Sequence, residues 1–502
     1  MGASEASFYP VREECRSRGM PTPSPSRLRK GDIFGVEEIG GTLMLDEQML
    51  PGKPPALARS LGVAGVLFLT LSATTPASSV FVIIPGMLQE AGTGAIWAMI
   101  LASLICVTTA FIYAELSSAW PVAGGEYVAV AQTLGPMAGF VMLGVNVFNN
   151  VLFPPVAALG IASVMATVVP GLPAVPVAVA VMIGATLVAI LNIRVNAIIT
   201  GLFLLIELLA VLVVMALGFA DHARPALEFL THPVAVAGER WAPASAASIG
   251  VATTIAIFAL NGYGMAVYFG EEMQEAPRRI ARTILSALGL ALLFEGVPLL
   301  ALLLAKIDLR TLLSVDDPFG LLVRQRGGPG LSALVSIGIM LAIVNAIIAC
   351  VLACARFFYS TGRDRAWIPR IDDWLVAIHP RFDSPWIGTI IVGGLGTLAC
   401  FLPMQLLLVL NGTGLVAIYG GIALAAMAGR RSGASAHAPY RMPLYPIAPV
   451  VTLLALGYVT WTSWLDVEEG RPGLIATAAQ IAGSVLWYKL VLCRRGQWRV
   501  RI

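Results

Sequence analysis

The chain has 502 residues, of which 58% are hydrophobic and only 12% are charged, and its mean hydropathy is +0.83. Soluble domains carry roughly 25% charged residues, so this composition excludes a soluble protein and indicates one that lies in a lipid bilayer. The net charge of +3 gives no reason to expect a nucleic-acid partner. The six cysteines and four histidines show no spacing typical of disulfides or metal ligands, so we expect no metal and no cofactor.

Polar sequence occupies both ends of the chain. Residues 1–55 are rich in Pro, Ser and Gly and lack the apolar core of a signal peptide, so we expect a disordered tail. Residues 56–430 contain ten hydrophobic runs of about 20 residues, the length that spans a bilayer, residues 431–493 contain two more, and residues 494–502 form a second tail. The runs cover about 60–88, 94–118, 136–168, 174–192, 196–220, 247–270, 281–305, 331–359, 386–402, 404–428, 446–465 and 473–492.

The distribution of basic residues predicts the orientation. With twelve spans and the N-terminus inside, the inner loops and tails hold 25 of the 32 Lys and Arg residues and the outer loops hold 7. Cytoplasmic segments carry the excess of positive charge, so we expect a multi-pass protein of the cell membrane with both termini in the cytoplasm.

The first hydrophobic run contains a helix-breaking segment, Leu71–Phe81 (LSATTPASSVF). An unpaired backbone group in lipid costs several kcal/mol, so a broken helix persists only where it lines a cavity or a ligand. Four hydroxyl residues flank Pro76 in this segment: Thr74, Thr75, Ser78 and Ser79. The hydroxyls of Ser78 and Ser79 are candidates for donors to a bound ligand, although such hydroxyls also bond to their own backbone.

The third run carries amides on one helix face, at Asn146, Asn149 and Asn150. Such side chains either contact a ligand or hold neighbouring helices together, and the second role is the more common.

An acidic residue, Glu207, lies in the middle of the fifth run. A charge at mid-bilayer costs at least ~2.5 kcal/mol, so an ionisable residue there indicates function. Burial disfavours the charged form of a carboxyl group, so Glu207 either exchanges a proton with water or, when ionised, attracts a sodium ion or a cationic substrate. Glu295 in the seventh run is the second such residue.

The sixth run is interrupted at Phe258–Gly264 (FALNGYG). The unwound stretch Asn261, Gly262, Tyr263 and Gly264 would leave backbone carbonyls free for an ammonium group. Interruptions at corresponding positions of two halves are the best sequence indication of a transporter's binding site.

Three motifs follow the second, sixth and eighth runs: Ala114–Tyr127 (AELSSAWPVAGGEY), Glu271–Arg282 (EEMQEAPRRIAR) and Ala355–Pro369 (ARFFYSTGRDRAWIP). They closely resemble the AELSxxxPxAGGxY, EExxNPxRxIPxA and SRxxYxxxRDGxxP motifs of the amino acid–polyamine–organocation permease superfamily. The resemblance covers roughly residues 60–430.

The resemblance implies an all-α membrane fold of twelve helices, with a five-plus-five inverted repeat of the leucine-transporter type and two additional helices. It also implies that both broken helices surround the substrate. On that basis the expected binding residues are Thr75, Ala77, Ser78, Ser79, Phe258, Asn261, Gly262, Tyr263 and Gly264. The expected cytoplasmic gate residues are Glu115, Glu271, Glu272, Arg278 and Arg279.

Positions in the first, fifth and sixth runs depart from the family pattern. Asn261 stands where many members have an aromatic residue, and Tyr263 is also unusual. The usual Gly-Ser-Gly-Ile-Phe of the first broken helix is replaced by Ala77–Phe81 (ASSVF), and Glu207 stands where many relatives have a lysine whose ammonium replaces a sodium ion. A carboxyl group cannot substitute for that cation.

The function that we expect is secondary active transport of an amino acid or related amine by alternating access, with a proton or, alternatively, sodium as coupling ion, or with exchange of substrates. No nucleotide-binding loop is present, which argues against ATP as the energy source. The alternative is a nutrient sensor with a permease-like site. An enzyme is not expected, because no paired nucleophile and base is visible.

Overall fold

The computed structural model describes residues 57, 59–165, 168–169, 171–221, 224–237, 240–465, 467, 470–496, 498 and 500. The expected tail at residues 1–55 lies outside the described residues, and the expected tail at residues 494–502 is described only in part. Within the described residues, nine helical segments are long and apolar enough to cross a membrane, and the first of them, Val63–Ala119, contains two of the expected runs. Ala174–Ala189 and Trp386–Ala399 are shorter apolar helices.

The long helical segments follow the hydrophobic runs in chain order. They are α2 (Val63–Thr74) with α3 (Pro76–Ser78), the π-helical η2 (Ser79–Ile83) and α4 (Ile84–Ala91); α5 (Ala95–Ala119); α7 (Pro136–Met165); α8 (Ala174–Ala189); α9 (Ile193–Ala220); α11 (Ala246–Ala259) with the 3₁₀-helical η4 (Tyr263–Phe269); α12 (Ala276–Ala291) with the π-helical η5 (Leu292–Gly296) and α13 (Val297–Leu304); α15 (Pro318–Arg363); α17 (Trp386–Ala399); α18 (Met404–Ser432); α19 (Ile447–Leu465); and α20 (Gly470–Trp487) with the π-helical η6 (Tyr488–Leu492) and α21 (Cys493–Arg495).

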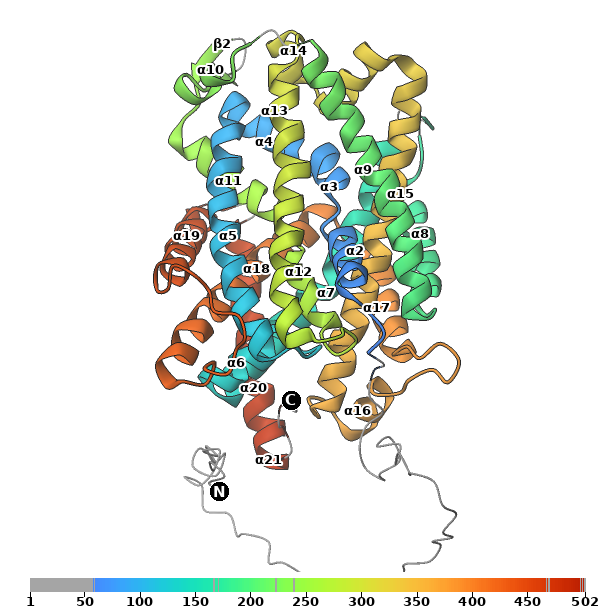
Figure 1. Cartoon of the computed structure of the whole chain (residues 1–502), viewed down its shortest axis with the longest axis vertical. Helices are drawn as coiled ribbons and strands as arrows, with labels where there is room; N and C mark the ends of the chain where they lie inside the picture. The colour runs from blue at the N-terminus through green and yellow to red at the C-terminus, as the bar shows by residue number, and fades with distance from the viewer. Residues whose placement is uncertain are drawn as a thin grey trace, which may run out of the picture.

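Short elements connect them at the two ends of the bundle. These are η3 (Gly92–Gly94), α6 (Glu126–Leu134), α10 (Ala226–Thr231), α14 (Leu309–Ser314) and α16 (Pro369–Leu375), together with the antiparallel strands β1 (Val234–Ala237) and β2 (Arg240–Pro243). This hairpin is the exception to the expected all-helical fold. In Figure 1, α10, α14 and β2 lie at one end of the molecule, and α6, α16 and α21 lie at the other.

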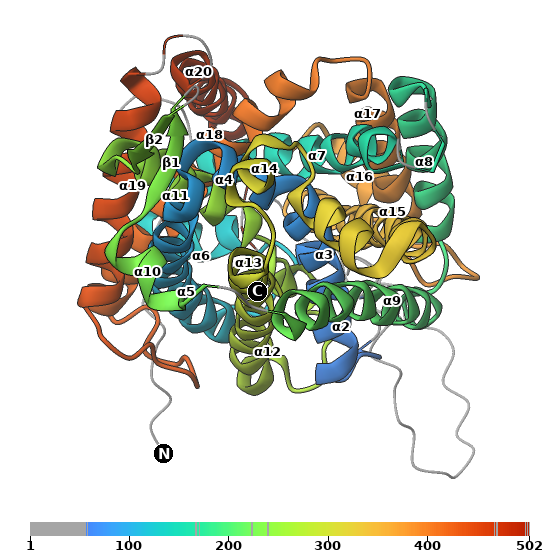
Figure 2. The ribbon, with the colours of Figure 1, turned by 90° about the horizontal axis from the view of Figure 1, so that it is seen from above.

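The helices differ in how much of their surface is enclosed. α15 is the most enclosed of the membrane-length segments in the described part, and α20 is the least. Figure 2 shows α15 beside α3 and α9, whereas α19 and α20 lie at the periphery. Large apolar side chains such as Leu187, Ile198 and Leu454 are exposed. A bilayer solvates such side chains, so this outer surface suits contact with lipid.

Both interruptions occur where the sequence predicts them. α2 ends at Thr74 because Thr75 adopts a left-handed conformation (φ 48°, ψ 70°) and Pro76 has no N–H to continue the helix. α11 ends at Ala259, and Gly262 has a φ of 117° that a residue with a side chain rarely adopts. The chain then continues as η4, whose geometry differs from that of the preceding helix.

Candidate functional site

The two breaks lie directly against each other. A Cβ atom added at Gly262 would lie 2.8 Å from the Cα atom of Thr74, so only glycine allows this approach. The hydroxyl of Ser79 donates a hydrogen bond to the carbonyl oxygen of Ala259 at 3.0 Å, which joins the start of η2 to the last turn of α11. The structure therefore brings the expected residues of the first and sixth runs together.

Glu207 of α9 reaches this meeting point. Its side chain is fully buried, and Oε1 accepts hydrogen bonds from the hydroxyl of Thr75 at 3.1 Å and from the backbone N–H of Ala77 at 3.0 Å. The start of a helix favours a negative group because its first N–H groups have no intrahelical acceptor. The N–H of Ala77 is the first one available after the break, since Pro76 has none, and Glu207 is its acceptor.

Glu207 has no partner for its second oxygen. Oε2 is buried without a hydrogen-bond partner among the described residues. The same is true of both carboxyl oxygens of Glu295, which lies in η5 and is fully buried. η5 contacts α3, as does α9, which carries Glu207. Two acidic side chains therefore approach the first break from two different helices.

The aromatic and polar residues of the second break have partners in the third, second and tenth runs. The ring of Phe258 packs against that of Phe153 on α7, with centroids 6.3 Å apart. The hydroxyl of Tyr419 on α18 donates to Oδ1 of Asn261 at 2.6 Å. Tyr263 is fully buried with its ring edge-on to Tyr113, and its hydroxyl has no partner within the described part of the chain.

Glu126, at the start of α6, is a candidate that the sequence did not reveal. It is buried and accepts hydrogen bonds from the hydroxyls of Tyr113 and Tyr268, each at 2.9 Å, and from the amide of Asn146 at 3.1 Å. Asn150 donates to the hydroxyl of Tyr268 at 3.4 Å. The asparagines of the third run therefore join helices, as the more common of their two roles predicts.

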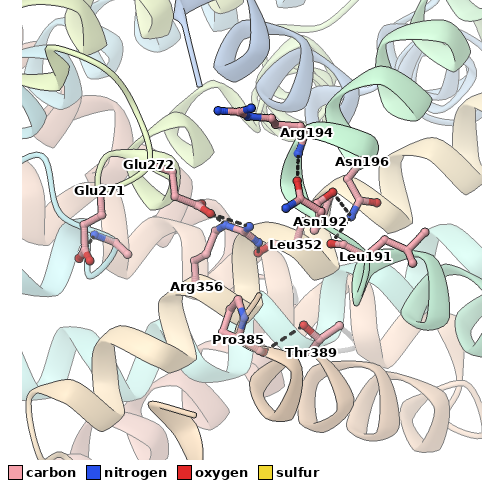
Figure 3. Close-up of polar contacts among 11 residues, drawn as sticks. Leu191, Asn192, Arg194, Asn196, Glu271, Glu272, Leu352, Arg356, Pro385 and Thr389 are labelled. Atoms are coloured by element: carbon pink, nitrogen blue, oxygen red, sulfur yellow. Dashed lines mark hydrogen bonds and ion pairs between the residues drawn. The ribbon is translucent and has the colours of Figure 1, made fainter. Parts of the chain in front are cut away.

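The three sequence motifs meet at the end of the molecule where α6 and α16 lie. Nη2 of Arg356 donates to Glu272 Oε1 at 3.0 Å, Nε of the same arginine donates to Oε2, and both side chains are buried. Figure 3 shows these two side chains pointing toward each other, with Glu271 beside them. Glu271 pairs with Arg363 and also accepts a hydrogen bond from the N–H of Ala123 at 2.9 Å.

Two further contacts complete this polar end. The carboxylate of Glu115 accepts two hydrogen bonds from Arg430, each at 2.6 Å, and one from the N–H of Met442 at 2.9 Å. The hydroxyl of Tyr127 donates to Asp364 at 2.8 Å. We call the ion pairs Glu115–Arg430, Glu271–Arg363 and Glu272–Arg356 the basal ion pairs.

The expected gate residues divide into two groups. Glu115, Glu271 and Glu272 belong to the basal ion pairs, and their partners are arginines of α15 and α18. Arg278 and Arg279 do not belong to them. Arg278 is exposed with no side-chain partner in the described residues, and Arg279 pairs with Glu275 one helical turn away, at 3.1 Å and largely in solvent. The expectation that they take part in the gate therefore has no support in the geometry.

Broken helices that enclose buried polar groups, flanked by paired charges at one end of an apolar bundle, define a membrane transporter. The chain belongs to the amino acid permease family, since the family described as "Amino acid permease" matches residues 61–491. It is accordingly a permease and not an enzyme. The superfamily resemblance found in the sequence is confirmed.

Relatives support this assignment. The chain is 26% identical to an uncharacterized transporter of Mycobacterium tuberculosis, over 68% of this chain and 73% of the relative. It is 24% identical to the methylthioribose transporter of Bacillus subtilis, over 82% of this chain and 92% of the relative. It is also 23% identical to the chloroplastic cationic amino acid transporter 6 of Arabidopsis thaliana, over 79% of this chain and 70% of the relative.

Proposed function

We propose that this protein is a secondary active transporter that moves an amino acid or a related amine across the cytoplasmic membrane by alternating access. The observation that carries the proposal is the contact between the two breaks at Thr74 and Gly262, with Glu207 hydrogen-bonded at the first of them. Such a site, formed by two unwound helices, is where transporters bind their substrates. Relatives named for cationic amino acids and for methylthioribose agree with a small polar substrate.

The proposed architecture is twelve spans, the first ten forming a five-plus-five inverted repeat, with both termini in the cytoplasm. Leu61, near the first described residue, forms backbone hydrogen bonds with Glu272 and Gln274 at 2.9 Å. α21, near the other terminus, lies at the same end of the molecule (Figure 1). The excess of Lys and Arg in the loops and tails assigned to this end favours the cytoplasm.

The proposed binding residues are those of the two breaks. Thr75, Ala77, Ser78 and Ser79 form one side, and Asn261, Gly262, Tyr263 and Gly264 the other, with Phe258 closing over the ligand. Glu207 and Glu295 are the proposed coupling residues. A buried carboxyl group that is transiently hydrated is suited to proton exchange, and sodium is the alternative coupling ion.

Alternating access requires contacts that form on one side only. We propose that the basal ion pairs close the cytoplasmic side, because they join the loops after the second and sixth runs to the ends of α15 and α18. When that side opens, these pairs separate and water replaces them.

The test is uptake of labelled compounds into proteoliposomes, with and without an inward proton gradient. The panel contains cationic and neutral amino acids, amines and methylthioribose. Glu207→Gln is compared with wild type and with Glu90→Gln, a control in which the altered carboxyl group is exposed at the end of α4. Gradient-driven uptake that is lost only in Glu207→Gln would support proton coupling through Glu207. Uptake that depends only on internal substrate would indicate an exchanger.

The alternative, a nutrient sensor, predicts binding without uptake. Deletion of residues 1–55 separates the two functions, because a carrier keeps its uptake while a sensor loses its signal.

A further inference from the structure

The hydrogen-bond donors at the first break are nearly all engaged by groups of the protein itself. Pro76 has no N–H, and the N–H of Ala77 donates to Glu207. The N–H of Ser79 donates to the carbonyl of Thr75 at 3.1 Å.

Three of the four hydroxyls beside Pro76 are engaged in the same way, and that of Ser78 is the exception. Thr75 donates to Glu207, Ser79 donates to Ala259, and Thr74 donates to the carbonyl of Thr70 at 3.0 Å. A substrate carboxylate is only an acceptor and needs several donors. In this structure the first break leaves few donors free for a substrate carboxylate.

Acceptors, by contrast, remain unpaired around the same break. Among the described residues, Oε2 of Glu207 and both carboxyl oxygens of Glu295 are buried without a partner. Oδ1 of Asn345 is also unpaired, and its amide nitrogen donates to Ser72 on α2 at 2.9 Å. A buried acceptor without a partner costs about 1–3 kcal/mol, and more when it is charged. A ligand that donates hydrogen bonds to these oxygens would remove that cost.

The charges point in the same direction. η5, which carries Glu295, and α9, which carries Glu207, both contact α3 at the first break. Arg356, Arg363 and Arg430 are engaged with acidic partners in the basal ion pairs, at the end of the bundle. A substrate carboxylate would be repelled by these two acidic side chains when they are ionised, whereas an ammonium favours their ionised form and would pair with them through charge-assisted hydrogen bonds.

We infer that the substrate is an organic amine that carries no carboxylate, held by its ammonium group between Glu207 and Glu295. This inference rests on the proposed transport function. It narrows the proposed substrates from amino acids and amines to amines alone. Of the unpaired buried donors in the described residues, the hydroxyl of Tyr263 lies at the second break, and a hydroxyl can accept a hydrogen bond from an ammonium as well as donate one. The hydroxyl of Ser435 follows the end of α18. The unpaired amide nitrogen of Asn411 lies on α18, against Asn149, and the unpaired ring N–H of Trp498 packs with Phe140.

The experiment compares each amino acid with the amine that lacks only its carboxylate. Wild-type protein in proteoliposomes is supplied with labelled lysine or cadaverine, and with arginine or agmatine, at equal concentrations. We expect initial uptake of each amine to exceed that of its parent amino acid by at least about tenfold, a difference of ~1.4 kcal/mol. Unlabelled cadaverine should inhibit agmatine uptake, and unlabelled lysine should not.

Two variants test the site. Glu295→Gln should raise the KM for cadaverine at least about tenfold, because it removes one of the two charges that pair with the ammonium. Glu90→Gln, the exposed control, should behave as wild type.

Each outcome of the wild-type comparison is decisive. Uptake of lysine or arginine at a rate equal to or above that of the matching amine would overturn the inference and leave the transport function standing. Uptake of none of the panel of amino acids and amines would reject the proposed function, and the inference with it. Because wild type decides the question, a Glu295→Gln protein that failed to fold would not affect the result.

Discussion

Oε1 of Glu207 lies 3.0 Å from the backbone nitrogen of Ala77, so a side chain of α9 holds the first free N–H group after the break in the first run. The resemblance to the permease superfamily implies a lysine at this position in many relatives. An ammonium can only donate hydrogen bonds, whereas a carboxylate can only accept them. The replacement of lysine by glutamate therefore changes which groups of the break can find a hydrogen-bond partner on this side chain. In this chain the carboxylate accepts from the Ala77 N–H and the Thr75 hydroxyl.

Glu207→Gln and Glu207→Ala should differ in stability. Glutamine keeps a side-chain oxygen for the Ala77 N–H, whereas alanine leaves that N–H buried without an acceptor, which costs about 1–3 kcal/mol. We expect Glu207→Ala to have the lower melting temperature in detergent, measured by thermal unfolding. Both variants should lose the proton-gradient dependence of uptake. Equal melting temperatures would show that Glu207 does not support the break.

Gly262→Ala should disrupt the contact between the two breaks. Its Cβ would lie 2.8 Å from Thr74 Cα, and a φ of 117° is itself strained for alanine. Overpacking of this kind typically costs 1–3 kcal/mol, and we expect uptake to fall by at least about tenfold. Gly289→Ala on α12 is the matched control, since no atom lies within 4 Å of the added Cβ. Similar uptake in both variants would contradict the close approach.

Removing one partner should destabilise the protein far more for the buried pair Glu272–Arg356 than for an exposed pair. Arg356→Gln leaves Glu272 buried and unpaired, which costs about 3–5 kcal/mol. Arg279→Gln removes the exposed pair with Glu275 and should change stability by about 0–1 kcal/mol.

A double-mutant cycle measures this coupling. Thermal unfolding of Glu272→Gln, Arg356→Gln and the double variant should show that the second substitution restores part of the stability lost in the first. Strictly additive losses would mean that the two side chains do not interact in the folded protein.

Glu126→Gln tests the carboxyl group that the sequence did not reveal. Its two oxygens accept from Tyr113, Tyr268 and Asn146, and the amide of glutamine would place a donor against at least one of these donors. We expect a loss of about 1–3 kcal/mol in stability and slower uptake. Glu228→Gln, an exposed residue of α10, is the control. Wild-type stability and uptake in Glu126→Gln would show that the three donors are satisfied by other means.

Much of the helical architecture was predictable, because a run of about 20 apolar residues must form a helix in a bilayer. The positions of both breaks were also predictable. Pro76 and Gly262 act on their own stretch of backbone, and their effect does not depend on distant residues. The β1–β2 hairpin was not predicted, because its residues lie between the fifth and sixth runs, in a segment that no hydrophobic pattern identifies.

The partners of the charged residues were less predictable. Arg278 and Arg279 follow Glu271 and Glu272 closely in the chain, yet these glutamates pair with Arg363 and Arg356 of α15. Glu126 belongs to a recognised motif, but the three side chains that donate to it come from different helices. Sequence spacing cannot show such contacts, since it reports only neighbours along one helix.

The sequence alone determined the class of protein, the places where its helices break and the acidic residues that lie within the membrane, because composition and backbone preferences are local properties. Only the tertiary structure decided that the two breaks meet at Gly262, that Glu207 is bonded to Ala77, and that acceptors remain unpaired beside Glu295. These relationships depend on how helices pack against each other. Packing in turn depends on the fit of many side chains, which no single stretch of sequence specifies.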